Sequence, residues 1–203
     1  MELIPWILAS YLLGAIPTSY LVVRLVKGED LRRLGRGNLG ATNLYRSLGW
    51  RYALPVALFD VSKGAIPVLL FAPRAGGTDL VALLLGAAAV LGHVFSVFVS
   101  FRGGKGVATA AGMVLGLAPL AFLAALAVWA LVLAVTGFVS LASMLAALAL
   151  PPAVYLLEPE RRPLIWLFAL LAALIVVFHR ANIRRLLAGT EHRFGRQAAR
   201  GGS

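Results

Sequence analysis

The feature that most constrains this chain is a series of long, uncharged apolar runs between Leu3 and Phe178. Of the 203 residues, 61% are hydrophobic, and the mean hydropathy is +0.89. Such runs are longer than a soluble core needs, and a helix satisfies its own backbone groups inside a bilayer. The sequence therefore predicts an all-α, polytopic helical membrane protein, with residues 1–203 forming a single domain.

Seven membrane spans are expected. Three long runs are each sufficient to cross a bilayer: Leu3–Val26, Tyr52–Phe71 and Asp79 to about Ser100. Pro17 is expected to kink the first of them. The apolar region 107–178 is divided into four shorter crossings by prolines, a glycine and charges at Pro119, at Thr136-Gly137 and at 158–163. Residues 107–118 are short for a crossing, so a partly re-entrant segment stays an alternative there.

The basic residues predict the orientation. Most of the 19 Lys and Arg residues fall on one side of this arrangement, in the loop 24–51, the turn 102–105 and the tail from Arg180. Because basic loops mark the cytoplasmic side, we expect a multi-pass protein of the cell membrane with its N-terminus outside and its C-terminus in the cytoplasm. The net charge of +11 is then a consequence of topology, and no nucleic-acid partner is expected. The first run has no basic segment before it and no convincing cleavage site, so we interpret it as a retained span.

A cationic, glycine-rich turn, Arg102–Gly106, follows the third span. Consecutive glycines such as Gly103 and Gly104 let the backbone form a concave nest of N–H groups, and Lys105 adds a full positive charge. Phosphate is therefore the expected ligand. The turn is not a Walker loop, because Gly106 stands where that motif has Ser or Thr and no strand pattern precedes it. For this turn alone, a flexible loop between two spans is the alternative.

Two further polar clusters lie on the same predicted face: Gly35–Arg46 and His179–Glu191. Positive-inside bias is the alternative, and it explains basic residues such as Arg24, Lys27, Arg196 and Arg200. It does not explain the uncharged hydrogen-bonding side chains of Asn38, Thr42, Asn43 and Asn182. Three such clusters at one lipid–water boundary predict a site for phosphorylated ligands, with apolar helices supplying a slot for an acyl chain. His179 and Asn182, three residues apart, are expected to share a helix face.

Asp60, Lys63 and His93 are ionisable residues that lie within predicted spans, away from the span ends. An unpaired charge at the centre of a span costs at least about 3 kcal/mol. Asp60 and Lys63 are three residues apart, so we expect an intrahelical ion pair that supports the site. For His93, two interpretations stay open: a buried neutral side chain with one hydrogen bond, or a brace for the turn or the phosphate site.

With these residues in view, the chain resembles the bacterial membrane-integral glycerol-3-phosphate acyltransferases that use acyl phosphate as donor. Three blocks carry the resemblance: Gly-Asn-Leu-Gly-Ala-Thr-Asn-Leu-Tyr-Arg at 37–46, Gly92–Thr109 with its Arg-Gly-Gly-Lys-Gly, and His179–Glu191. Asp60-Val61-Ser62-Lys63-Gly64 also looks like the family's Asp-x-x-Lys-Gly. The blocks follow the family's order and cover most of the polar sequence, and together they are highly specific.

The resemblance implies a seven-span fold with an active site at the inner leaflet of the membrane. It also implies an enzyme of phospholipid biosynthesis that transfers a fatty acyl group from acyl phosphate to the 1-hydroxyl of glycerol 3-phosphate. The products are lysophosphatidic acid and phosphate. Because acyl phosphate is already activated, the reaction requires no cofactor, metal or covalent enzyme intermediate.

Both substrates carry a phosphate, and the residues are assigned on that basis. We expect glycerol 3-phosphate to be held by a catalytic set: Arg46, Lys105, His179 and Asn182. We expect acyl phosphate to lie against backbone N–H groups and amides of a second set: Asn38, Gly40, Thr42, Asn43, Gly103 and Gly104. Further substrate-binding candidates are Arg36, His93 and Gly106. The hydroxyl proton is taken either by His179 or by a phosphate oxygen of a bound substrate.

Two positions depart from the family's pattern. Arg36 stands where the family usually has serine, and it either replaces a hydroxyl contact with a charged phosphate contact or points away. Ser96 stands where proline is common in the family, which affects a kink near the site.

Other reaction classes fit the sequence less well. A His-x4-Asp acyltransferase needs an aspartate five residues after the histidine, but Phe98 follows His93 and Arg184 follows His179 at that spacing. A CDP-alcohol phosphotransferase needs clustered aspartates, and the chain has only eight acidic residues. A phosphate transporter would line a path with cations at mid-membrane depth, where only Lys63 and His93 fall. The chain has no cysteine, which excludes disulfides and thiolate chemistry.

Overall fold

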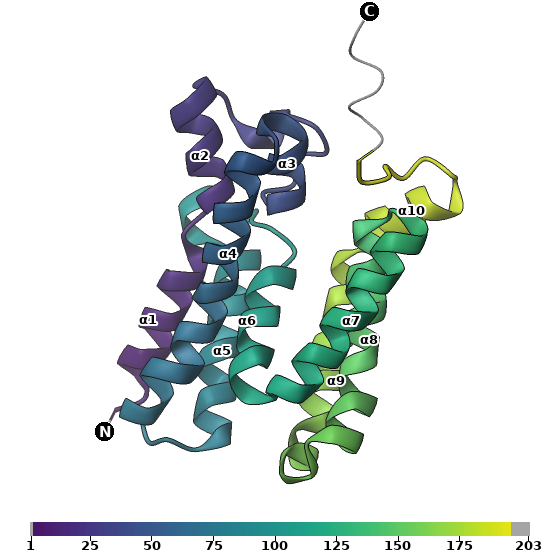
Figure 1. Cartoon of the computed structure of the whole chain (residues 1–203). Coiled ribbons are helices and arrows are strands. Elements are labelled where there is room, and N and C mark those ends of the chain that lie inside the picture. The colour runs from purple at the N-terminus through teal and green to yellow at the C-terminus, as the bar shows by residue number, and fades with distance from the viewer. Residues whose placement is uncertain (1, 196–203) are drawn as a thin grey trace, which may run out of the picture. The chain divides into compact units, whose positions relative to one another are not determined.

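The computed structural model describes residues 2–195. This part of the chain consists of helices joined by turns and short loops, and it contains no strand (Figure 1). Six helical segments are long and apolar enough to cross a membrane: Ile4–Lys27, Trp50–Arg74, Asp79–Val99, Pro119–Thr136, Val139–Leu157 and Pro159–Phe178. These segments confirm the predicted class of all-α, multi-pass membrane protein. A further apolar helix, Val107–Leu117, has 11 residues and extends about 16 Å, against about 30 Å for the hydrocarbon core. The seventh crossing therefore stays a prediction.

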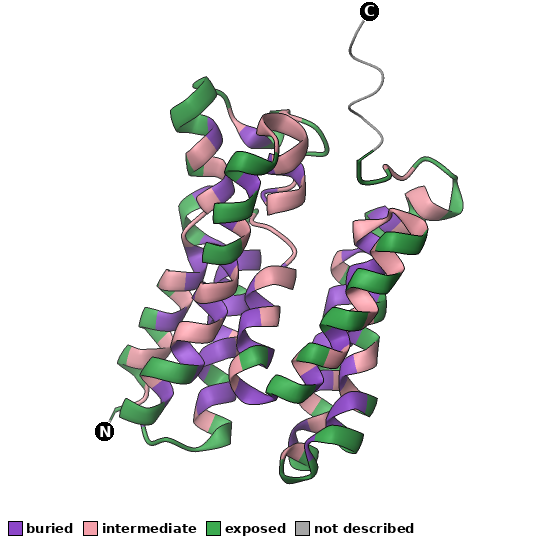
Figure 2. Ribbon diagram, viewed as in Figure 1, coloured by how far each residue is buried: buried purple, intermediate pink, exposed green. Residues whose placement is uncertain are grey.

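The chain divides after Leu117 into two compact units. Each unit has buried residues of its own (Figure 2). That residues 1–203 act as a single domain stays a prediction.

Four helices form the body of the first unit: α1 (Ile4–Ala15), α4 (Trp50–Ile66), α5 (Asp79–Val94) and α6 (Val107–Leu117). α1 packs along α5, and α4 packs along α6, with buried residues gathered between these helices (Figure 2). At the end opposite the N-terminus lie α2 (Thr18–Lys27) and α3 (Ala41–Leu48) (Figure 1). Short 3₁₀ or π segments complete the unit: η1 (Leu31–Arg33), η2 (Pro67–Phe71), η3 (Ala72–Arg74) and η4 (Val97–Val99).

The first predicted span is broken rather than kinked. Ile16 and Pro17 leave helical geometry, with ψ angles of 113° and 69°, so that α1 ends at Ala15 and α2 begins at Thr18. A proline has no N–H to donate, and its ring clashes with the preceding helical turn. The carbonyl groups at the end of α1 therefore need partners from elsewhere in the chain.

Two glycines let α4 and α6 approach backbone to backbone. A Cβ atom on Gly64 would collide with the carbonyl oxygen of Thr109, and one on Gly112 would collide with that of Val61. Small residues at such contacts are typical of membrane helix pairs, which associate by close van der Waals packing. The contact fixes α6, which begins directly after the glycine-rich turn, against the second half of α4.

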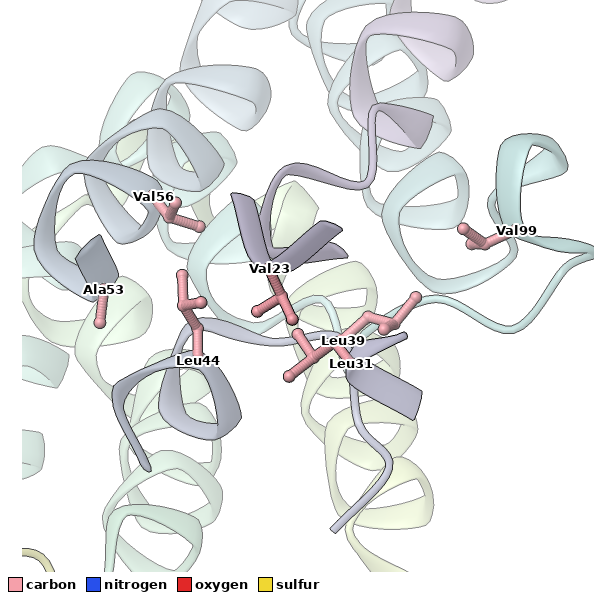
Figure 3. Packing of buried hydrophobic residues seen from close by; sticks show 7 residues of the cluster. All are labelled: Val23, Leu31, Leu39, Leu44, Ala53, Val56 and Val99. Carbon is pink, nitrogen blue, oxygen red and sulfur yellow. The ribbon is translucent and has the colours of Figure 1, made fainter. Parts of the chain in front are cut away.

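The segment between α2 and α4 has a hydrophobic core of its own, formed by one buried cluster: Val23, Leu31, Leu39, Leu44, Ala53, Val56 and Val99 (Figure 3). Part of this segment, Gly35–Arg46, was expected to be a loop, but α3 begins at Ala41. The helix is explained by its amphipathic pattern: Leu44 belongs to the cluster, and Ala41, Tyr45 and Leu48 at helical spacing pack against it. Because Val99 lies just before the glycine-rich turn, the cluster also ties that turn to the segment.

The second unit is a helical hairpin with a third helix packed against it. α7 (Pro119–Thr136) ends at Gly137, whose φ of 74° starts the turn into α8 (Val139–Leu157). α8 packs against both α7 and α9 (Ile165–Phe178). η5 (Pro159–Leu164) joins α8 to α9, and α10 (Arg180–Leu187) follows α9. The three predicted divisions of the region 107–178 are thus confirmed.

Gly112→Ala is expected to lower the free energy of unfolding by about 1–3 kcal/mol, the usual cost of overpacking, because the added methyl group collides with the carbonyl oxygen of Val61. Thermal unfolding of the purified protein in detergent measures this effect. Ala127→Leu is the control, since it adds bulk to an exposed position of α7. A wild-type midpoint for Gly112→Ala would show that this contact does not hold the two helices together.

Candidate functional site

The glycine-rich turn follows an irregular segment that begins earlier than expected. α5 ends at Val94 rather than near Ser100, and residues 95–106 lead from there to α6. Ser100 and Phe101 both have positive φ, 57° and 61°. Residues other than glycine rarely adopt this conformation, which is concentrated at functional sites. The backbone at Ser100 and Phe101, immediately before the turn, is therefore held in an energetically unfavourable conformation.

The N–H groups of Gly103 and Gly104 are already engaged within the protein. They donate to the carbonyl oxygens of Val94 and His93, at 3.0 and 3.1 Å. These two amides are thus used within the segment itself, and a phosphate contact of Gly103 and Gly104 stays a prediction. A Cβ atom on Gly104 would collide with the imidazole ring of His93, so this glycine is needed for close approach to the histidine.

The start of α6 offers a different set of backbone donors. Gly106 is buried and has a φ of 77°, which lets the chain turn from Lys105 into the helix at Val107. The first N–H groups of a helix have no intrahelical partner, and the helix dipole favours an anion beside them. The start of α6 can therefore offer backbone donors to an anion directly after Lys105.

Asn43 is buried inside the segment before α4, and both ends of its amide are used there. Its Oδ1 accepts the N–H of Arg36 at 3.0 Å, and its Nδ2 donates to the carbonyl oxygen of Leu34 at 3.1 Å. Both ends of the amide are therefore used within the protein, and the assignment of Asn43 to acyl phosphate stays a prediction. This pairing holds the loop that carries Arg36.

The other residues of this segment remain candidates for ligand contact. Oδ1 of Asn38 accepts the N–H of Gly40 at 2.9 Å, which fixes the entry to α3. Thr42 and Arg46 are half-buried on α3, and four-residue spacing places them on one face of the helix. Arg36 is exposed. Since the buried cluster joins α3 to the glycine-rich turn, the first unit brings two of the three predicted clusters together.

The third cluster lies in the second unit, at the start of α10. His179 and Asn182 are both buried, with 3% and 6% exposure. Nδ1 of His179 lies 2.8 Å from the carbonyl oxygen of Ile175. Because a carbonyl oxygen only accepts, this contact assigns the proton to Nδ1, and Nε2 of the neutral ring is an acceptor. His179 thus has the tautomer that a general base requires at Nε2.

Glu191 organises this cluster, although the sequence reasoning gave it no role. Its carboxylate accepts hydrogen bonds from Asn182 Nδ2 at 2.6 Å, Arg185 Nε at 2.5 Å and Ser140 Oγ at 3.0 Å. Burial raises the pKa of Glu191, but these hydrogen bonds outweigh burial and hold the pKa below its ordinary value. A lone carboxylate in a strongly basic tail was the signal that could have identified it.

The predicted ion pair inside α4 is confirmed. Lys63 Nζ lies 2.6 Å from Asp60 Oδ1, and both side chains are buried. His93 is buried beside this pair. Its ring lies between the ion pair and Gly104, which agrees with the interpretation of His93 as a brace.

Comparison with known proteins gives the family. The family model described as glycerol-3-phosphate acyltransferase matches residues 4–189. The chain belongs to the glycerol-3-phosphate acyltransferase family. Similar members include those of Trichlorobacter lovleyi, 48% identical over 93% of this chain and 96% of the relative, and Geobacter sulfurreducens, 46% identical over 91% and 94%.

Solved structures of a glycerol-3-phosphate acyltransferase share the fold. The integral membrane enzyme PlsY in its glycerol 3-phosphate form is 38% identical, with a TM-score of 0.87 over 95% of this chain and 96% of that chain. Its lysophosphatidic acid form is 36% identical, with a TM-score of 0.83 over 95% of both chains. At this identity and coverage, the likeness extends over almost the whole molecule.

For this glycerol-3-phosphate acyltransferase, Asn43→Ala is expected to lower the free energy of unfolding by about 1–3 kcal/mol, because it leaves partly buried backbone groups of Leu34 and Arg36 without this partner. Thermal unfolding in detergent tests this. Ser47→Ala on the same helix removes only a hydrogen bond to the carbonyl oxygen of Asn43 and serves as the control. An unchanged midpoint of thermal unfolding together with a raised KM for the acyl donor would instead place Asn43 at the substrate site.

Glu191 predicts an acid-sensitive contribution to stability. The folded-state pKa is lowered, whereas an unfolded glutamate titrates near pH 4.3. Its stabilising contribution is therefore complete above about pH 4.3 and is lost as the pH falls through the folded pKa. The unfolding midpoint of Glu191→Gln should depend less on pH between 7 and 3.5 than that of wild type. The exposed Glu160→Gln is the control, and equal pH dependence of all three proteins would contradict this role.

Proposed function

We propose that the chain transfers a fatty acyl group from acyl phosphate to the 1-hydroxyl of glycerol 3-phosphate and releases lysophosphatidic acid and phosphate. The observation that carries the proposal is the likeness over almost the full chain to an enzyme solved in a glycerol 3-phosphate form and in a lysophosphatidic acid form. These ligands are the acyl acceptor and the acylated product of the reaction. The polar clusters contain the cations and helix terminus that two phosphorylated substrates need.

Cations and amides suit the phosphate of glycerol 3-phosphate. We assign Arg46 and Lys105 of the first unit to this phosphate, because charged donors make roughly twice the contribution of neutral ones. Asn182 donates an amide to the same substrate, with its carboxamide oriented by Glu191. Arg36 is assigned to a supporting charge contact.

The acyl phosphate is assigned to neutral donors. Its phosphate lies against the first N–H groups of α6, which follow Gly106, with Asn38, Gly40 and Thr42 of the other cluster as further contacts. Gly103 and Gly104, which pack closely against His93 and bond to the backbone of α5, are assigned to the same phosphate only through their place next to Lys105. In this arrangement, the reaction takes place at the cytoplasmic face of the membrane.

The chemical step consists of one displacement. The 1-hydroxyl oxygen attacks the acyl carbon, the bond from that carbon to the phosphate oxygen breaks, and phosphate leaves. The hydroxyl proton goes to Nε2 of His179 or to an oxygen of the leaving phosphate. Holding both substrates in reacting geometry contributes up to about 7–11 kcal/mol, which suffices for an activated donor without a covalent enzyme intermediate.

Purified protein supplied with acyl phosphate and glycerol 3-phosphate, without added metal, should form lysophosphatidic acid and phosphate in equal amounts. Acyl-CoA should not replace acyl phosphate. Lys105→Ala is expected to lower kcat/KM by about 100-fold or more, the usual loss for a charge-stabilising donor in an active site. Mass spectrometry of the lipid product and a phosphate assay measure both results.

Lys27→Ala is the matched control, since it removes the same charge from an exposed position at the end of α2. It should leave the kinetics unchanged. Product formation from acyl-CoA at an equal rate would overturn the assignment of the donor, and near-normal turnover of Lys105→Ala would overturn its role.

A further inference from the structure

The break between α1 and α2 is satisfied by side chains from distant parts of the chain. Pro17 leaves the last carbonyl groups of α1 without helical partners. Ser96 Oγ donates to the carbonyl oxygen of Ala15 at 2.5 Å, and Lys63 Nζ donates to that of Ile16 at 2.9 Å. Both donors are buried, with 1% and 0% exposure. The carbonyl oxygen of Ile16 also accepts the N–H of Thr18 at 3.0 Å, so Ser96 and Lys63 bring the partners of the break that come from distant parts of the chain.

Lys63 also belongs to a buried polar cluster that joins three elements. Its ammonium group pairs with Asp60 Oδ1 at 2.6 Å, and the same oxygen accepts Thr18 Oγ1 at 3.3 Å. Nδ1 of His93 lies 3.4 Å from Lys63 Nζ and 3.9 Å from Asp60 Oδ1. Each charge therefore has an opposite charge and hydrogen-bonding groups around it, which is the condition for keeping a buried pair in a membrane protein.

This cluster reaches the glycine-rich turn at two points. The carbonyl oxygen of His93 accepts the N–H of Gly104 at 3.1 Å, and the His93 ring lies where a Cβ of Gly104 would be. The carbonyl oxygen of Ser96 accepts the N–H of Phe101 at 2.8 Å. Ser96 and His93 are thus in contact both with the interior of the bundle and with the segment that leads to Lys105.

We propose that Asp60, Lys63, His93 and Ser96 form a buried brace that fixes the glycine-rich turn against the break between α1 and α2 and so positions Lys105 for acyl transfer. The proposal rests on the proposed function for its kinetic consequence, but not for its structural one. These four are positioning residues, since their contacts are with each other, with Thr18 and with backbone groups of the break and of the segment that leads to Lys105. The buried charges serve to hold geometry, and no proton transfer to substrate is assigned to them.

The double variant Asp60→Asn/Lys63→Met tests the brace, because removing both charges leaves no lone buried charge to prevent folding. The natural chain has no cysteine, so spin labels can be attached at Leu25→Cys in α2 and Phe98→Cys in η4. Both positions are exposed, at 84% and 58%, and both lie in the first unit. Ser62→Ala on α4 is the control, since its hydroxyl bonds only to the carbonyl oxygen of Phe59.

In the double variant, the distribution of distances between the two labels should broaden relative to wild type and to Ser62→Ala. Measured per folded molecule, kcat/KM should fall roughly 100-fold, the effect of misplacing a reacting group by about 1 Å. If the four residues only stabilised the fold, the double variant would have a lower thermal midpoint, but its label distances and its kcat/KM would equal those of wild type.

The outcomes separate the two proposals. If wild type forms no lysophosphatidic acid from acyl phosphate, the proposed function fails, and the label distances still decide whether the brace exists. If wild type is active and the double variant keeps a narrow distribution with wild-type kinetics, the brace is overturned. Broadening with unchanged kinetics would overturn the positioning of Lys105, and slower kinetics without broadening would assign these residues a direct role.

Discussion

Inside the hydrocarbon core, polar groups find partners in the protein or not at all, and this constraint organises the first unit. Pro17 creates a break that exposes carbonyl groups, while Asp60 and Lys63 bring charges to the same depth of the bundle. Lys63 serves both the buried charge and the open carbonyl, since it pairs with Asp60 and also donates to the carbonyl oxygen of Ile16. The relative placement of α1, α4 and α5 follows from these contacts, which leave little freedom for any of the three helices.

The parts of this arrangement that depend on local pattern could be read from the sequence. Apolar length and hydropathy gave the spans, and the breaks at Pro119 and Thr136-Gly137 followed from the helix-breaking residues themselves. The Asp60–Lys63 pair followed from a three-residue spacing on one helix. Each of these inferences uses residues within a few positions of each other, and the same holds for the three polar clusters.

Contacts between distant segments were not predictable in this way. The sequence identified Asn43 as a polar residue in the right cluster, but its amide is used to hold the loop around Arg36. The sequence alone assigns no role to Glu191, although its carboxylate accepts a hydrogen bond from Asn182, nine positions away in the chain. Ser96 and Ala15 are 81 positions apart, and no local pattern indicates that a hydroxyl reaches that carbonyl. Such pairings become visible only when the packing of the helices is known.

The shortness of α6 has a consequence for the biogenesis of the protein. With 11 residues, α6 is far below the length at which a segment partitions into the bilayer on its own hydropathy. Its contact through Gly112 is with α4, which leaves the ribosome earlier and is continuous with a segment of spanning length. If α6 crosses the membrane as predicted, its entry requires an already inserted partner, and the order of helices along the chain supplies α4 before α6 is made.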